Sequence, residues 1–179
     1  MAAILTLDLG TTFFKAALFG HDGRLLALER QSTPIAHPRP GEWEIAAEQF
    51  RATLRDILAA LRTKAPDDYA AVQAVSFATQ SNSFVLLDAA DQPLTPIILW
   101  PDKRAKEFDN AAAAVSATED FREVTGVPRL TYEFMAAKLL WLRHHQPEAW
   151  AHARRLCLIS DYLTLWLTGL SAAGKSTLA

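Results

Sequence analysis

The start of the chain alternates short apolar runs with polar turns, a pattern typical of β-strands. Apolar residues dominate 4–9, 15–19 and 25–32, and Asp22-Gly23 lies between the last two runs. An Asp-Gly pair in that place favours a two-residue hairpin turn. We therefore predict three strands that form an antiparallel meander.

Apolar side chains recur at helical spacing in 46–62, which predicts an amphipathic helix. Its apolar face would consist of Phe50, Leu54, Ile57, Leu58 and Leu61. The later pattern predicts strands at 72–77, 84–87 and 155–159, an extended segment at 96–100, and helices that follow 101–104, cover 119–124 and cover 134–145. Ser160-Asp161 would cap a last segment at 162–167. Hairpins followed by alternating helices and strands indicate a mixed α/β domain.

Composition narrows the classes of protein to which the chain could belong. Its 179 residues suit one domain, half of them are apolar, and the formal net charge is −2. No Lys/Arg block suggests a nucleic-acid partner, and no apolar run is long enough to cross a bilayer. Asp8 interrupts the first apolar run, which argues against a signal peptide. The single cysteine, Cys157, is expected to be a buried hydrophobe in a cytoplasmic protein, and the five histidines lack metal spacing.

The first two predicted strands enclose a candidate phosphate site. Asp8 ends an apolar strand, Gly10-Thr11-Thr12 form a tight turn, and Lys15 follows. A carboxylate can hold hydrated Mg²⁺, while backbone N–H groups, hydroxyls and a cation can bind phosphate oxygens. The alternative is an ordinary hairpin in which the Asp caps its own turn.

Seven segments in order resemble the amino-terminal part of an FGGY-type carbohydrate kinase, the xylulokinase and glycerol kinase group. They are DLGTTFFKAALF (8–19), GEWEIAAEQF (41–50), ATQSNSFVLLD (78–88), PIILWPDKR (96–104), TGVPRL (125–130), AAKLLWLRHHQPEAW (136–150) and SDYLTLWLTG (160–169). Each segment is weak alone, but together they cover nearly the whole chain. The resemblance implies a ribonuclease H-like (actin-like ATPase) fold, with a mixed sheet and flanking helices. It also implies ATP-dependent phosphorylation of a sugar or polyol hydroxyl.

Roles at the phosphate site follow from this resemblance. Asp8 would organise Mg²⁺, residues 10–12 would surround the ATP phosphates, and Lys15 would lie near the β- and γ-phosphates. Phe13 and Phe14 replace the small hydroxyl residues found there in glycerol kinases, which would remove one phosphate contact.

The resemblance also implies a substrate site. Gln80-Ser81-Asn82 replaces the Gln-Met-His of xylulokinases and the Gln-Arg-Glu of glycerol kinases, and short uncharged groups suit sugar hydroxyls. Trp100 would pack on the C–H face of a sugar ring, and Asp102 would accept hydrogen bonds from hydroxyls. The alternatives are a polar turn at 80–82, a core role for Trp100 and a helix N-cap at Asp102.

In this family the general base is an Asp that would lie beyond residue 179, as would a second domain that holds adenine. We therefore expect the chain to be inactive alone, with no catalytic residue of its own and with exposed apolar surface. The full-length protein could form a homodimer. A catalytically inactive sugar-binding domain is the alternative function.

The end of the chain carries a competing motif. Gly169–Ser176 fits G-x-x-x-x-G-K-[ST] and resembles the P-loop of adenylylsulfate kinases, with Lys175 on the phosphates and Ser176 on Mg²⁺. A P-loop requires a strand before Gly169, whereas the sugar kinase resemblance predicts a helix there. A chimeric origin of 165–179 would explain both matches.

Overall fold

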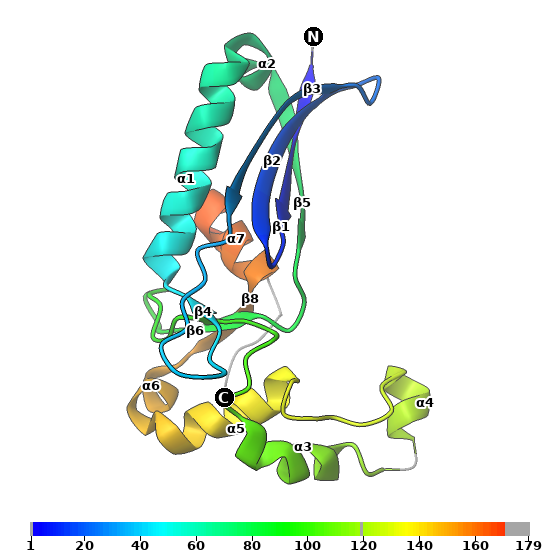
Figure 1. Cartoon of the computed structure of the whole chain (residues 1–179), viewed down its shortest axis with the longest axis vertical. Coiled ribbons are helices and arrows are strands. Elements are labelled where there is room, and N and C mark those ends of the chain that lie inside the picture. Colours follow the sequence, from blue (N-terminus) through cyan, green and yellow to red (C-terminus); the bar gives the residue numbers. More distant parts are fainter. Residues whose placement is uncertain (1, 119, 171–179) are drawn as a thin grey trace. The chain divides into compact units, whose positions relative to one another are not determined.

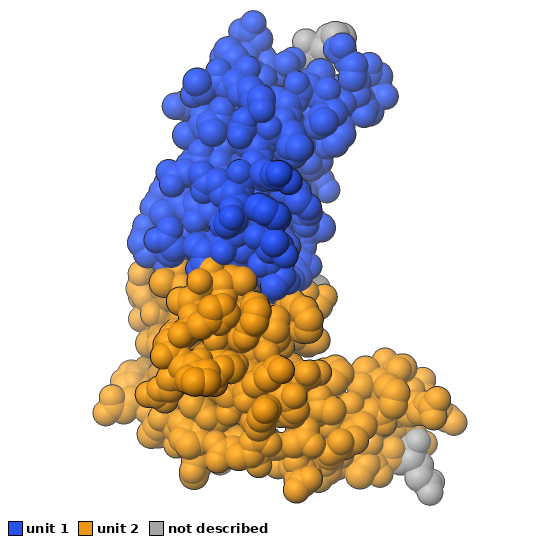
Figure 2. Space-filling view, viewed as in Figure 1, with its two compact units in different colours: residues 1–34, 47–80 blue, residues 35–46, 81–179 orange. Residues whose placement is uncertain are grey.

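The computed structural model describes residues 2–118 and 120–170 and divides the chain into two compact units (Figure 2). Unit 1 comprises Met1–Pro34 and Ala47–Gln80, and unit 2 comprises Ile35–Ala46 and Ser81–Ala179. The chain therefore leaves unit 1 after residue 34, contributes a short segment to unit 2, returns to unit 1 at residue 47 and enters unit 2 again at residue 81. Each unit has its own sheet, and we describe each by itself.

Unit 1 is built on a four-stranded sheet in the order β3-β2-β1-β5. Its strands are β1 (Ala3–Leu9), β2 (Phe13–Gly20), β3 (Leu25–Ser32) and β5 (Val72–Thr79). Strands β1 to β3 are antiparallel neighbours, and β5 adds to β1 in the parallel direction. The predicted meander is confirmed, and the parallel strand makes the sheet mixed.

The hairpin between β2 and β3 is longer than predicted. Four residues, not two, separate the strands, and Gly20 N–H donates to the Arg24 carbonyl at 2.9 Å. Asp22 Oδ1 accepts from the Arg24 amide at 3.0 Å, and Gly23 has a φ of +80°. The Asp-Gly pair thus lies in the turn, but the carboxylate stabilises a wider loop.

Helix α1 (Ala47–Lys64) covers one face of this sheet (Figure 1). Alternate residues of the strands point toward it, so Leu7 and Leu18 are buried against the helix face that includes Phe50 and Leu54. The rings of Phe14 and Phe50 meet edge to face, with centroids 5.5 Å apart. The short helix α2 (Pro66–Ala70) then leads to β5. The predicted amphipathic helix is confirmed, although Leu58 is only half-buried.

Strand β5 is the edge of the sheet, and most of its side chains are exposed. Val75 and Phe77 are the large apolar residues among them. They point to the same side as Leu5 and Leu7, their partners on β1, which are buried. The expected uncovered apolar surface is therefore present within the described part of unit 1.

Unit 2 is built on an antiparallel sheet in the order β4-β7-β6-β8. Its strands are β4 (Glu44–Ile45), β7 (Ile97–Ile98), β6 (Phe84–Leu87) and β8 (Arg155–Leu158), and its helices are η1 (Lys106–Phe108), α3 (Asp109–Val115), α4 (Phe121–Thr125), α5 (Met135–His145), α6 (Pro147–His152) and α7 (Ile159–Thr168). Phe84 and Ile98 of the sheet share a core with Trp141 and Leu142 of α5. Helix α6 was not predicted, although Pro147 suits a first helical position.

Residues 159–168 are helical, which decides one of the alternatives at the carboxyl end. Asp161 lies inside α7 and accepts from the Leu158 amide at 3.2 Å, so the helix begins earlier than the predicted Ser160-Asp161 cap. Gly169, with a φ of +68°, ends the helix. The strand that a P-loop requires is absent here, and the helix expected for a sugar kinase is present. Residues 171–179, which include Lys175, Ser176 and most of the segment proposed as chimeric, lie outside the described residues.

Candidate functional site

The candidate phosphate group in unit 1 centres on an ion pair between neighbouring strands. Asp8 on β1 stands directly across from Lys15 on β2, and Lys15 Nζ donates to Asp8 Oδ2 at 2.8 Å. The two side chains are 53% and 43% exposed. They lie on the face of the sheet that α1 does not cover, because they alternate with the buried residues Leu7 and Phe14. The carboxylate is thus accessible and bound to a cation rather than buried.

The turn between β1 and β2 is tied down by its backbone. Gly10 N–H donates to the Phe13 carbonyl at 3.1 Å, and a Cβ added to Gly10 would lie 3.2 Å from that oxygen. Thr33 forms two hydrogen bonds to the turn. Its hydroxyl donates to the Gly10 carbonyl at 2.9 Å, and its amide donates to the Thr12 carbonyl at 3.0 Å. These contacts fix the turn while Thr12 stays exposed. A fixed turn with accessible hydroxyls next to a carboxylate and an ammonium can bind a metal-phosphate group.

Gln80 belongs to this group and not to the substrate group in which the sequence placed it. Its amide donates to the Leu9 carbonyl at 3.2 Å, and Thr11 Oγ1 lies 3.5 Å from its Oε1. Of the two phenylalanines, Phe14 is buried in the core, whereas Phe13 lies on the face that carries Lys15 and contacts the guanidinium of Arg30. Only Phe13 therefore bears on the predicted loss of a phosphate contact.

The candidate substrate group lies in unit 2 and begins with the turn before β6. Ser81 and Asn82 are exposed, and Asn82 has a φ of +55°, in the left-handed region that only a few residue types adopt readily. Ser83 is buried, and its hydroxyl accepts the amide of Trp100 at 2.9 Å. It also lies 3.5 Å from the Ser81 carbonyl. The turn and Trp100 are thus joined through one hydroxyl.

Trp100 is not a core residue, because 45% of it is exposed. Its backbone is held in place while its indole faces solvent. An exposed indole on a backbone held in place can pack on the apolar face of a sugar ring. Ser83 thus links Trp100 to the turn that holds Ser81 and Asn82, and the role of these residues in sugar binding stays a prediction.

Asp102 does not join them. It is 0% exposed, and its carboxylate accepts from the Trp43 amide at 2.7 Å and from the Arg104 amide and guanidinium at 2.9 Å each. Arg104 also donates to Glu44 at 2.7 Å. Burial opposes the charge of Arg104, but these carboxylates outweigh it and raise the arginine pKa. Asp102 thus lacks the exposure that its predicted contact with a hydroxyl would need, and its bonds are those of a structural carboxylate.

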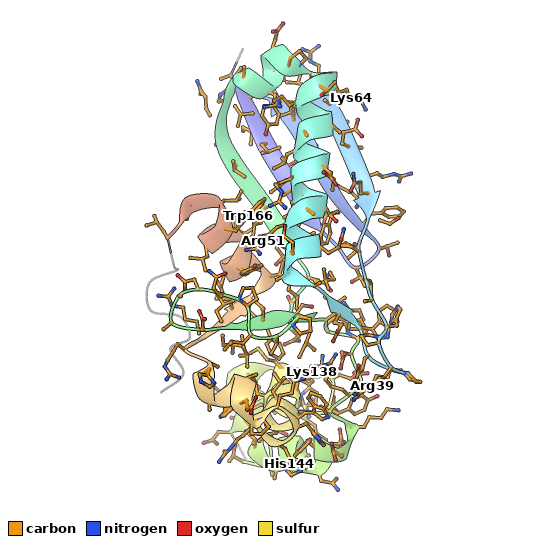
Figure 3. The ribbon with its side chains drawn as sticks, turned by 90° about the vertical axis from the view of Figure 1, so that its left-hand side faces the viewer. Arg39, Arg51, Lys64, Lys138, His144 and Trp166 are labelled. Atoms are coloured by element: carbon orange, nitrogen blue, oxygen red, sulfur yellow. The ribbon has the colours of Figure 1, made fainter. Side chains whose placement is uncertain are left out.

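Sequence reasoning missed Lys138, a fully buried cation on α5 (Figure 3). Its ammonium donates to the carbonyls of Leu99 and Trp100 at 2.9 and 2.8 Å. Burial lowers the pKa of Lys138 to about 8, against the opposing influence of Asp102. The available signal was a lysine among the apolar residues of 134–145, the segment in which a helix was predicted.

Residues 2–118 and 120–170 contain no cluster of three His, Cys, Asp or Glu side chains that could enclose a metal ion. Asp8 nevertheless suits Mg²⁺, which is commonly held by one or two carboxylates together with substrate phosphates and water. Cys157 is buried as predicted, and burial raises its pKa to about 11, so it is a poor nucleophile. Among the described helices, none combines the length and the apolarity needed to span a membrane.

Comparison with known proteins identifies relatives along almost the whole chain. The FGGY family of carbohydrate kinases, N-terminal domain, matches residues 3–179. Xylulose kinase of Escherichia coli strain K12 is 34% identical over 175 residues, which are 97% of this chain and 35% of that protein. Glycerol kinase of Dechloromonas aromatica strain RCB is 33% identical over 175 residues, 97% of this chain and 34% of that protein.

A solved structure agrees with these sequences. The crystal structure of a "xyloylose kinase" from Brucella ovis superposes with a TM-score of 0.86 and 33% identity, covering 93% of this chain and 34% of that one. The fold is thus the ribonuclease H-like, actin-like ATPase fold. The chain spans about a third of the length of the curated relatives it matches. With its sequence and its fold in agreement, this chain belongs to the FGGY family of carbohydrate kinases and corresponds to their N-terminal domain.

Proposed function

We propose that this chain is the amino-terminal part of a kinase that transfers the γ-phosphoryl group of Mg²⁺–ATP to a hydroxyl of a sugar or polyol. The observation that carries the proposal is the half-exposed Asp8–Lys15 pair beside a fixed turn. Kinases of this family provide the general context, and relatives include a xylulose kinase and a glycerol kinase. The substrate class is therefore a small, uncharged polyhydroxyl compound.

On the phosphate side, Asp8 would hold Mg²⁺ through its oxygens, and the metal would neutralise charge on the phosphates. Because Asp8 is paired with Lys15 in the structure, metal binding would compete for the carboxylate and release the ammonium to the phosphate oxygens. The hydroxyls of Thr11 and Thr12 and the backbone of Gly10 would complete the contacts. Positioning and charge neutralisation supply most of the catalysis in phosphoryl transfer.

On the substrate side, Ser81 and Asn82 would exchange hydrogen bonds with hydroxyls, and the indole of Trp100 would contact the C–H face. The sequence places Ser81 directly after Gln80, the last residue of the phosphate group. The carboxylate nearest in sequence to Trp100 is Asp102, which is buried and bonded, so it cannot act as a base on a bound hydroxyl. We therefore propose that the isolated chain binds ligands without turnover, and that a soluble cytoplasmic kinase contains it.

A calorimetric titration of the 179-residue chain with Mg²⁺–ATP tests the phosphate side. We expect binding that Asp8→Ala weakens by roughly tenfold or more, the scale of one lost metal ligand. Asp56→Ala, which removes another exposed carboxylate of unit 1, is the matched control and should bind like the original chain. Equal affinities for all three proteins would refute the role of Asp8. Phosphorylation of D-xylulose or glycerol by the chain alone would refute its inactivity.

A further inference from the structure

A charge buried in unit 2 has no part in the site described so far. Lys138 is completely shielded from solvent, although a methionine of similar length would fill the same space without a buried charge. The cost of burial is visible in its pKa, which falls to about 8. The charged groups that influence it are Asp102, Arg104 and Glu133. The hydrogen bonds of the ammonium indicate which part of the backbone it stabilises.

The ammonium binds two consecutive backbone carbonyls, those of Leu99 and Trp100. The amide of Trp100 is held from its other side by the hydroxyl of Ser83. The peptide group before the Trp100 Cα is thus anchored both to α5 and to Ser83, and the peptide group after it is anchored to α5. A residue held in this way keeps its side chain in a narrow range of orientations while the indole stays exposed.

Ser83 extends this fixed point to the neighbouring turn. It follows Ser81 and Asn82 directly, and its hydroxyl lies within 3.5 Å of the Ser81 carbonyl. The Ser83 hydroxyl therefore contacts both the turn of Ser81 and Asn82 and the backbone of Trp100, which together form the proposed sugar surface. Loss of the bond between the Lys138 ammonium and the Trp100 carbonyl would make Trp100 more mobile, and the Trp100 amide is the group that donates to the Ser83 hydroxyl.

We propose that Lys138 is a positioning residue for sugar recognition, acting through the backbone of Trp100 without touching the substrate. This rests on the proposed function, because it assumes that Ser81, Asn82 and Trp100 form the sugar surface. Binding sites gain affinity and rate when their contact groups are fixed before the ligand arrives. The ammonium provides that fixation at Trp100, whose indole is the large apolar contact of the proposed surface.

Amide hydrogen exchange of the 179-residue chain tests the positioning directly. In Lys138→Met, the Trp100 amide should exchange roughly tenfold faster or more, because its peptide group loses the bond to the ammonium and keeps only the bond to Ser83. The amide of Leu86, which donates to the Thr95 hydroxyl at 3.1 Å in the same unit, is the internal reference and should not change. Lys106→Met, at an exposed lysine of unit 2, should alter neither amide. Unchanged exchange at Trp100, or equal acceleration at Trp100 and Leu86, would overturn the proposal.

A second variant keeps the test decisive if Lys138→Met does not fold. Ser83→Ala removes the other anchor of Trp100 and adds no charge or volume, so it should also accelerate exchange at the Trp100 amide. No acceleration in this variant would contradict the proposed coupling.

Ligand titrations add the functional readout. D-Xylulose and glycerol, each followed through the Trp100 amide resonance, should bind Lys138→Met roughly tenfold more weakly, while Mg²⁺–ATP affinity stays within about twofold. Equal weakening of sugar and ATP binding would mean general disruption and would overturn the positioning role. If the original chain binds neither compound, the proposed function fails, whereas the exchange measurement still decides what Lys138 does to Trp100.

Discussion

The stability of unit 2 should rise with pH in a narrow alkaline window. The pKa of Lys138 is about 8 in the folded protein and 10.5 is the ordinary value. Between these values the unfolded chain holds a proton that the folded chain has lost, so the free energy of unfolding increases with pH. The increase is fully present above pH 10.5 and is lost as the pH falls to 8. At about 1.4 kcal/mol for each pH unit, it amounts to roughly 3 kcal/mol.

Cys157 opposes this increase at higher pH. Burial raises its pKa from 9.0 to about 11, so its contribution to stability is present below pH 9 and is lost toward pH 11. The slopes of Cys157 and Lys138 have opposite signs and similar size between pH 9 and 10.5. The net effect is therefore a gain of about 1 kcal/mol from pH 8 to pH 9, followed by a plateau.

Urea unfolding followed by tryptophan fluorescence measures this effect selectively, because all five tryptophans lie in unit 2. The control is Lys138→Met, which should show no gain between pH 8 and 9. Cys157→Ala should extend the rise of the original chain beyond pH 9. If the original chain and Lys138→Met had parallel pH profiles, the low pKa of Lys138 would be wrong.

Three further predictions concern separate parts of the molecule. Phe50→Ala should destabilise unit 1 by about 3–5 kcal/mol, since it removes a buried ring that packs on Phe14, and circular dichroism during urea unfolding would measure the loss. Trp100→Ala should weaken binding of D-xylulose or glycerol by roughly tenfold while changing stability by under about 1 kcal/mol, because the ring is exposed; calorimetry and unfolding curves would check the two values. We expect the exposed edge strand β5 to mediate self-association, which Phe77→Lys should reduce in sedimentation experiments without loss of stability, because it places a charge there. An unchanged association constant would show that β5 does not mediate the contact.

The parts of the fold that could be predicted are those determined by local pattern. Strand β1 alternates buried residues with more exposed ones, and α1 repeats Phe50, Leu54, Ile57 and Leu61 at helical spacing. Each of these elements has one face toward solvent and one toward the core, so the periodic spacing of apolar residues reveals the element. Helix α6 has six residues, too few for a periodic signal, and it was missed.

At the candidate site, sequence and structure agree only for residues whose side chains are exposed, and their binding roles stay predictions. Asp8, Lys15, Ser81, Asn82 and Trp100 are accessible, as polar or aromatic binding groups should be. Asp102 and Lys138 are both charged and both buried, and nothing in their sequence spacing shows this. Their roles depend on which distant backbone groups approach them, and such contacts arise from tertiary packing.

The left-handed backbone at Asn82 restricts how this protein could acquire a new preference. Glycine, asparagine and aspartate tolerate that geometry, whereas valine, isoleucine or threonine there would carry strain of about 1 kcal/mol or more. Ser81 has no such requirement, since its φ is not positive. Libraries aimed at altered selectivity should therefore randomise position 81 fully and draw position 82 from a short alphabet. Natural divergence in this loop would be expected to follow the same asymmetry.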